Sequence, residues 1–148
     1  MSEIWYYNLG RARLEKVLPA LLEKSLERGW RGVVEVGSTE RAEALDTVLW
    51  TFSDESFLPH ALAGDEDDAL QPVLLTTGSD NPNKAEVRFF VDGAVPRGGE
   101  PYERVVYIFD GHDPEAVATA RETWKTLRTD NEITYWQRDE RGRLVTQA

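Results

Sequence analysis

Apolar residues in this chain form short continuous runs, separated by segments in which they recur every three or four residues. The runs predict strands at residues 4–7, 32–36, 73–76, 86–91, 104–109 and 133–137. The wider spacing predicts helices that follow Gly10, Ser38 and Asp113 and end near residues 28, 50 and 128. Parallel strands joined by helical crossovers carry helices on both faces of their sheet. The pattern therefore predicts a three-layer α/β fold with a largely parallel sheet, as one domain over residues 1–148.

Proline, glycine and acidic residues mark the interruptions of this pattern. Pro19 lies within the first helical segment, where it either kinks the helix or marks a late start. Residues 51–71 contain Pro59, Gly64 and an acidic run, which predict a long connection with at most one short turn of helix. Long connections in compact domains are often functional. After the last predicted strand, Gly142 allows a turn and leaves a hairpin open.

Charge and composition narrow what this domain can bind. Its 148 residues include 17 Lys and Arg against 27 Asp and Glu, a net charge of −10. Because phosphate binding depends on clustered cations, we expect no direct DNA binding and no attraction to anionic membranes. The absence of cysteine excludes disulfides, thiolate nucleophiles and cysteine-ligated metals. The start lacks a signal-peptide pattern and no apolar run reaches about 18 residues, so we expect a soluble, cytoplasmic protein.

The sequence also lacks the motifs that open α/β sheets use for nucleotide or metal chemistry. A Rossmann-like fold binds phosphate through a glycine-rich loop after the first strand, but here that loop has only one glycine, Asn8-Leu9-Gly10-Arg11. The two histidines, His60 and His112, lack metal-ligand spacing, and no serine lies in a G-x-S-x-G elbow. We therefore expect a Rossmann-like domain without cofactor, metal or catalytic constellation.

One enzymatic alternative stays open at Asp110 and His112. Both follow a predicted strand, and the carboxyl ends of strands are where α/β proteins place their sites. A small hydrolase or nucleotide-processing enzyme could use such a site. The same segment also suits a turn followed by an N-cap at Asp113, with Pro114 in the first helical position.

Two candidate binding surfaces stand out. Large aromatic residues at positions 50, 52 and 57 gather at a helix end and in the connection behind it. They either cover the core from outside or form a docking patch, because Trp and Phe dominate binding hot spots.

The second candidate surface lies on the last predicted helix. At about 100° per residue, Val117 and Trp124 belong to an apolar arc that Arg121, Lys125 and Arg128 continue on its next side. Three cations beside an indole suit an acidic ligand that also carries an apolar group. The other interpretation is a core helix with an ordinary solvated flank, and spacing alone weighs the two equally.

The central part of the sequence resembles the signature block of a known family. The residues that carry the resemblance are Leu49-Trp50, Glu55-Ser56-Phe57-Leu58-Pro59-His60 and Leu62-Ala63-Gly64. The tyrosine-containing first strand, the helix ending in Glu27-Arg28-Gly29-Trp30-Arg31 and the late helix with Ala120-Arg121-Glu122 fall in the family's order. In this arrangement the chain resembles the chi subunit of bacterial DNA polymerase III over nearly its whole length.

The resemblance implies a non-catalytic accessory role. The chi family looks like a nucleotide-binding fold that has lost its nucleotide. It serves in the clamp-loader assembly, pairs with the psi subunit and holds the acidic C-terminal tail of single-stranded-DNA-binding protein, which ends in Pro-Phe and a free carboxylate. Carried over to this sequence, the tail site consists of Arg121, Trp124, Lys125, Arg128 and Val117. The interface with psi or another clamp-loader component consists of Trp50, Phe57 and Pro59.

Overall fold

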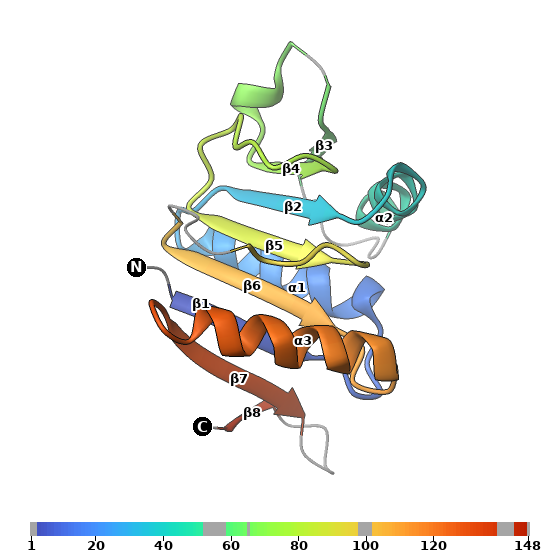
Figure 1. The fold of residues 1–148 in the computed structure, drawn as a ribbon. Coiled ribbons are helices and arrows are strands. Elements are labelled where there is room, and N and C mark those ends of the chain that lie inside the picture. Colours follow the sequence, from blue (N-terminus) through green and yellow to red (C-terminus); the bar gives the residue numbers. More distant parts are fainter. Residues whose placement is uncertain (1–2, 52–58, 65, 98–101, 139–143, 148) are drawn as a thin grey trace.

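The computed structural model describes residues 3–51, 59–64, 66–97, 102–138 and 144–147, which build one sheet with helices on both faces (Figure 1). The strands are β1 (Glu3–Asn8), β2 (Gly32–Val36), β3 (Ala61–Leu62), β4 (Val73–Thr76), β5 (Val87–Val91), β6 (Arg104–Phe109), β7 (Glu132–Arg138) and β8 (Leu144–Gln147). They lie in the order β3-β4-β2-β5-β6-β1-β7-β8. Neighbouring strands are parallel except β7 and β8, which are antiparallel.

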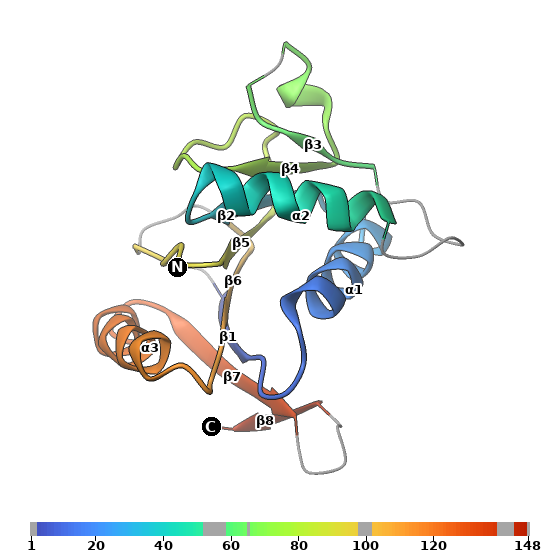
Figure 2. The same ribbon diagram turned by 90° about the vertical axis from the view of Figure 1, so that its right-hand side faces the viewer.

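The helices form the two outer layers. They are α1 (Leu14–Glu27), α2 (Thr39–Thr51) and α3 (Pro114–Leu127), with a short 3-10 turn, η1 (Asp68–Leu70), before β4. Figure 2 shows α1 and α2 on one side of the sheet and α3 on the other. Leu18 and Leu22 of α1 pack in one apolar layer, whereas Ala120 and Leu127 of α3 pack in a separate layer. These two layers bury both faces of the central strands, which is why those strands are continuous apolar runs. The predicted three-layer α/β fold with a largely parallel sheet is confirmed.

Most predicted elements agree with the structure to within one or two residues. Pro19 is buried inside α1, so the helix does not start late at this residue. The connection over residues 51–71 contains η1, the short turn of helix that was allowed for. It also contains β3, which was not predicted because two residues are too few to show a period. After the last predicted strand the chain does form an antiparallel pair, β7 and β8, while Gly142 itself lies outside the described residues.

Two adjacent strands in the middle of the sheet lead to opposite faces. β1 ends at Asn8 and is followed by α1, whereas β6 ends at Phe109 and is followed by α3. The two strands are parallel, and Asn8 lies opposite Phe109 in their register. Where successive helices leave a sheet on opposite faces, an opening forms at the carboxyl ends of the strands. This end of the sheet, beside α3, is therefore the natural place for a binding site.

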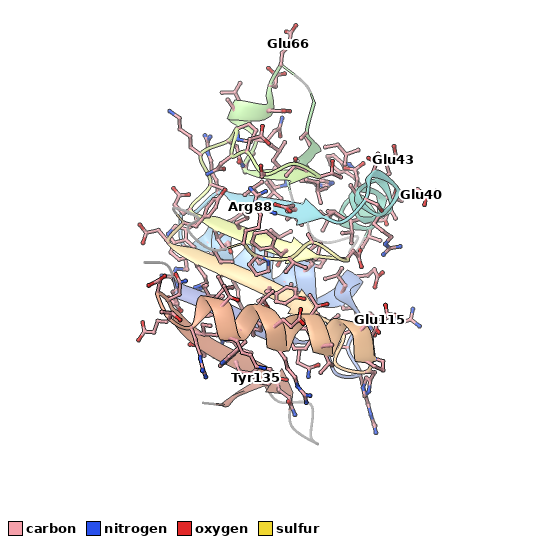
Figure 3. The ribbon with its side chains drawn as sticks, viewed as in Figure 1. Glu40, Glu43, Glu66, Arg88, Glu115 and Tyr135 are labelled. Atoms are coloured by element: carbon pink, nitrogen blue, oxygen red, sulfur yellow. The ribbon has the colours of Figure 1, made fainter. Side chains whose placement is uncertain are left out.

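A buried ion pair joins β2 to β5. Arg88, labelled in Figure 3, is fully buried and donates a hydrogen bond of 2.5 Å to Oε1 of Glu35. It also donates to two backbone carbonyls and to the hydroxyl of Tyr102. The half-exposed Arg97 donates to both carboxylate oxygens of Glu35, at 3.0 and 2.8 Å. Burial alone would raise the pKa of Glu35, but the hydrogen bonds from Arg97 and Arg88 outweigh it and lower that pKa below its ordinary value.

Candidate functional site

A pocket with a volume of about 610 Å³ lies between α3 and the strands β1, β6 and β7, and we call it the α3 groove. It is lined by Tyr6, Asn8, Phe109, Gly111, Val117, Ala120, Arg121, Trp124, Lys125, Arg128 and Tyr135. The lining thus combines one face of α3 with the carboxyl-terminal halves of the neighbouring strands. A cavity of this size accommodates a small ligand or the side chains of a short peptide.

The helix α3 places one side of the groove. Asp113 caps its N-terminus by accepting a hydrogen bond from the backbone N–H of Glu115, and Pro114 occupies the first turn. Side chains three or four residues apart on such a helix share a face. The structure accordingly brings all five residues of the expected tail site to this one groove: Val117, Arg121, Trp124, Lys125 and Arg128.

The floor of the groove is aromatic. The ring of Trp124 meets that of Tyr6 edge-on, with 5.0 Å between their centroids, and lies 6.4 Å from the ring of Tyr135. Tyr6 is almost fully buried, and its hydroxyl lies 2.5 Å from Oγ1 of Thr123. Burial raises the pKa of Tyr6 to about 12, against a smaller lowering effect of the Thr123 hydrogen bond. The floor is therefore uncharged and suited to an apolar group.

The rim of the groove is cationic. Arg121, Lys125 and Arg128 are exposed, and none of them forms an ion pair with a carboxylate in the described part of the chain. The residues that line the groove include no Asp or Glu. In a chain of net charge −10, this site is a local concentration of positive charge beside an apolar floor.

The far wall of the groove was not anticipated from the sequence. Asn8 at the end of β1 accepts a hydrogen bond of 2.9 Å from the backbone N–H of Gly10 and donates one of 2.8 Å to the hydroxyl of Tyr135. Figure 3 shows Tyr135 on β7, below α3 in that view. A Cβ atom on Gly111 would collide with the side chain of Asn8, so a glycine keeps the loop close to it. The sequence does predict where these strands end. It does not predict that β1 and β7 are neighbours, which is needed to bring Asn8 and Tyr135 together.

The second predicted surface is described only in part. Trp50 is 51% exposed at the end of α2, and its ring lies 4.3 Å from that of the buried His60. Nε2 of His60 lies 3.1 Å from Oδ1 of Asp46, which orients the imidazole beneath the indole. Pro59 is half-buried beside them in sequence, and Phe57 lies outside the described residues. About half of Trp50 is thus exposed to solvent, while its indole packs against the buried imidazole of His60.

At the alternative site, which follows β6, the Asp side chains form hydrogen bonds to nearby backbone N–H groups. Oδ1 of Asp110 accepts a hydrogen bond from the backbone N–H of His112, which closes a turn, and Asp113 caps α3. His112 is exposed. Among the described residues, no group of three His, Asp or Glu side chains is placed to hold a metal ion. Within the same ranges, no helix is both long and apolar enough to cross a membrane.

The fold and the groove together define a class of protein. The chain is a Rossmann-like α/β domain in which a single-glycine loop replaces the phosphate-binding loop, and its α3 groove carries cations around an aromatic floor. A model of the family described as DNA polymerase III chi subunit, HolC, matches residues 1–133. The chain therefore belongs to the DNA polymerase III chi subunit family, whose members are accessory subunits of that replicase.

Two relatives illustrate the relationship. The chain is 31% identical to the DNA polymerase III subunit chi of Pseudomonas aeruginosa over 117 residues, which cover 79% of this chain and 80% of that protein. It is 30% identical to the probable DNA polymerase III subunit chi of Rickettsia prowazekii over 87 residues, which cover 59% of this chain. That second match spans only about half of the Rickettsia protein, 53% of its length.

Proposed function

We propose that this protein links the clamp-loader assembly of bacterial DNA polymerase III to single-stranded-DNA-binding protein by holding the acidic C-terminal tail of that protein in the α3 groove. The observation that carries the proposal is the joint placement of Arg121, Lys125 and Arg128 around the rings of Trp124 and Tyr135. The rim suits the carboxylates of the tail, and the floor suits its terminal Phe. Such a role is carried out in the bacterial cytoplasm.

The strength of the contact follows from its exposure. Ion pairs between exposed side chains are each worth about 0.2–1 kcal/mol, and salt screens them over a distance of about 10 Å at 0.1 M. The three rim cations are exposed, so each contributes a modest amount and the affinity falls as salt rises. A contact of this kind forms and breaks readily as the replisome moves.

We place the clamp-loader partner, psi or another component, on the surface around Trp50, Phe57 and Pro59. A half-exposed indole held by a buried histidine is the kind of rigid aromatic anchor that dominates protein interfaces. Trp50 lies at the end of α2, which packs on the opposite face of the sheet from α3. The two partners could therefore bind at the same time, as a linking role requires.

A peptide titration tests the tail site. The probe is a fluorescent acidic peptide that ends in Pro-Phe with a free carboxylate, titrated with the full chain at low salt. We expect saturable binding that weakens with added salt and that is lost when the final Phe is replaced by Ala. Arg121→Ala and Lys125→Ala should each weaken binding by up to about fivefold, the equivalent of one exposed ion pair.

A matched lysine provides the control. Lys24 is exposed in the last turn of α1, as Lys125 is in the last turn of α3, but α1 lies on the opposite face of the sheet. Lys24→Ala should leave the affinity unchanged. If the wild-type chain does not bind the peptide at low salt, or if Lys24→Ala weakens binding as much as Lys125→Ala, the groove is not the tail site.

A further inference from the structure

The hydroxyl of Tyr135 has a proton that the described residues do not use. The orientation of the Asn8 side-chain amide supports this conclusion. Its Oδ1 accepts a hydrogen bond of 2.9 Å from the backbone N–H of Gly10, so the amide atom that faces Tyr135 is Nδ2, which is a donor. Nδ2 donates to the hydroxyl oxygen of Tyr135 at 2.8 Å. That oxygen therefore acts as the acceptor in the bond, and its own hydrogen still needs an acceptor.

The other tyrosine of the groove is already satisfied. Oγ1 of Thr123 donates its single proton to the carbonyl of Ala120 at 3.0 Å. The hydroxyl of Tyr6, 2.5 Å from the same oxygen, must then be the donor in the Tyr6–Thr123 bond. Two phenols thus flank Trp124, one with its proton bound within the fold and one with its proton available to a ligand.

The phenol proton of Tyr135 belongs to a ring that lines the aromatic part of the α3 groove. Tyr135 is half-buried, lines the α3 groove and contacts the rings of Trp124 and Phe109. Within one Phe residue the ring and the terminal carboxylate are only a few ångströms apart. If the rings of the groove receive the side chain of a terminal Phe, its carboxylate therefore lies close to the Tyr135 hydroxyl. The exposed rim cations are then left to the acidic side chains earlier in the tail.

We infer that Tyr135, oriented by Asn8, is a specificity-determining residue that donates a hydrogen bond to the terminal carboxylate of the bound peptide. The inference rests on the proposed function and deepens it. The rim cations attract any acidic segment, whereas a neutral donor beside the aromatic floor distinguishes a chain end from an internal acidic stretch. The match to the family model ends at residue 133, so this assignment concerns a residue beyond the matched range.

The experiment compares two peptides that differ only in their last group. One is the acidic Pro-Phe peptide with a free carboxylate, and the other is the same peptide with a C-terminal amide. Tyr135→Phe removes the donor and keeps the ring. A hydrogen bond to a charged group is worth enough that its loss should weaken binding of the free acid by about tenfold, while binding of the amide changes by less than about twofold.

Tyr6→Phe is the matched control, because it removes the same atom from the ring on the other side of Trp124. It should lower the melting temperature through the lost Thr123 bond and leave the preference for the free acid unchanged. The inference is overturned if Tyr135→Phe weakens both peptides equally, or if the free acid binds it as tightly as it binds the wild type. Failure of the wild-type chain to bind either peptide would instead overturn the proposed function, so the two failures are distinct.

Discussion

Replacing Glu35 by Gln tests how the interior of the sheet is held together. The substitution keeps the shape of the side chain and removes its charge, which leaves Arg88 buried without an anion. Breaking a buried pair by removing one partner costs about 3–5 kcal/mol. Because Arg97 is half-exposed and shares the carboxylate, water reaches this end of the pair, so we expect a cost of about 3 kcal/mol at the lower end of that range.

Urea denaturation at neutral pH measures this cost directly. For a chain of this length, about 3 kcal/mol corresponds to a fall in melting temperature of roughly 6–12 °C. Arg97→Gln is the matched control, since it removes the exposed partner of the same carboxylate and should cost less than about 1 kcal/mol. A loss below 1 kcal/mol for Glu35→Gln, or an equal loss for Arg97→Gln, would refute the assignment of Arg88 and Glu35 as a buried pair that stabilises the fold.

The same pair predicts a pH dependence with a defined sign. The pKa of Glu35 is lowered in the folded chain, so its contribution to the free energy of unfolding is fully present above the ordinary pKa of a glutamate. It is lost as the pH falls through the lowered pKa, where the folded state also becomes protonated. The difference in stability between the wild type and Glu35→Gln should therefore shrink on acidification and should not shrink on going from neutral to alkaline pH.

Two further predictions concern the groove wall and the second surface. Gly111→Ala forces the side chain of Asn8 away from Gly10 and Tyr135 and should lower the free energy of unfolding in urea by about 1–3 kcal/mol. In the peptide titration this variant should no longer prefer the free carboxylate over the amide. An unchanged preference would mean that Asn8 does not orient Tyr135. Trp50→Ser should weaken binding to the clamp-loader assembly by about 2 kcal/mol or more in a calorimetric titration, with tail binding unchanged. Leu70→Ser, which removes another exposed apolar side chain, is its control and should leave both contacts intact.

The strands and helices were predictable because each shows its period within its own segment. The run at residues 104–109 is apolar at nearly every position since β6 is buried on both faces, and Asp113 with Pro114 is a local start signal for α3. The arc of Val117, Trp124 and the cations beside them is likewise local, since one helix carries it. These are the parts of the candidate site that could be found from the sequence alone.

The remaining parts depend on contacts between distant segments. Asn8 and Tyr135 are 127 residues apart, and they meet because β1 lies next to β7. Nothing in the sequence of either strand indicates that β1 and β7 are adjacent in the sheet. The pair of Arg88 and Glu35 was missed for a similar reason, since each charge stands alone within an apolar strand and only the pairing of β2 with β5 brings them together.

The position of β1 also bears on how the chain acquires its structure during synthesis. β1 is hydrogen-bonded on one side to β6 and on the other to β7, so that Glu3 pairs with both Arg104 and Glu132. Residues 9–103 separate β1 from β6. At about 5–20 residues per second, a ribosome needs roughly 5–20 s to add them. For the later part of that time β1 is outside the ribosome without either partner, a state that favours chaperone binding. The pairing of β1 on both sides is thus completed only after β7 has emerged.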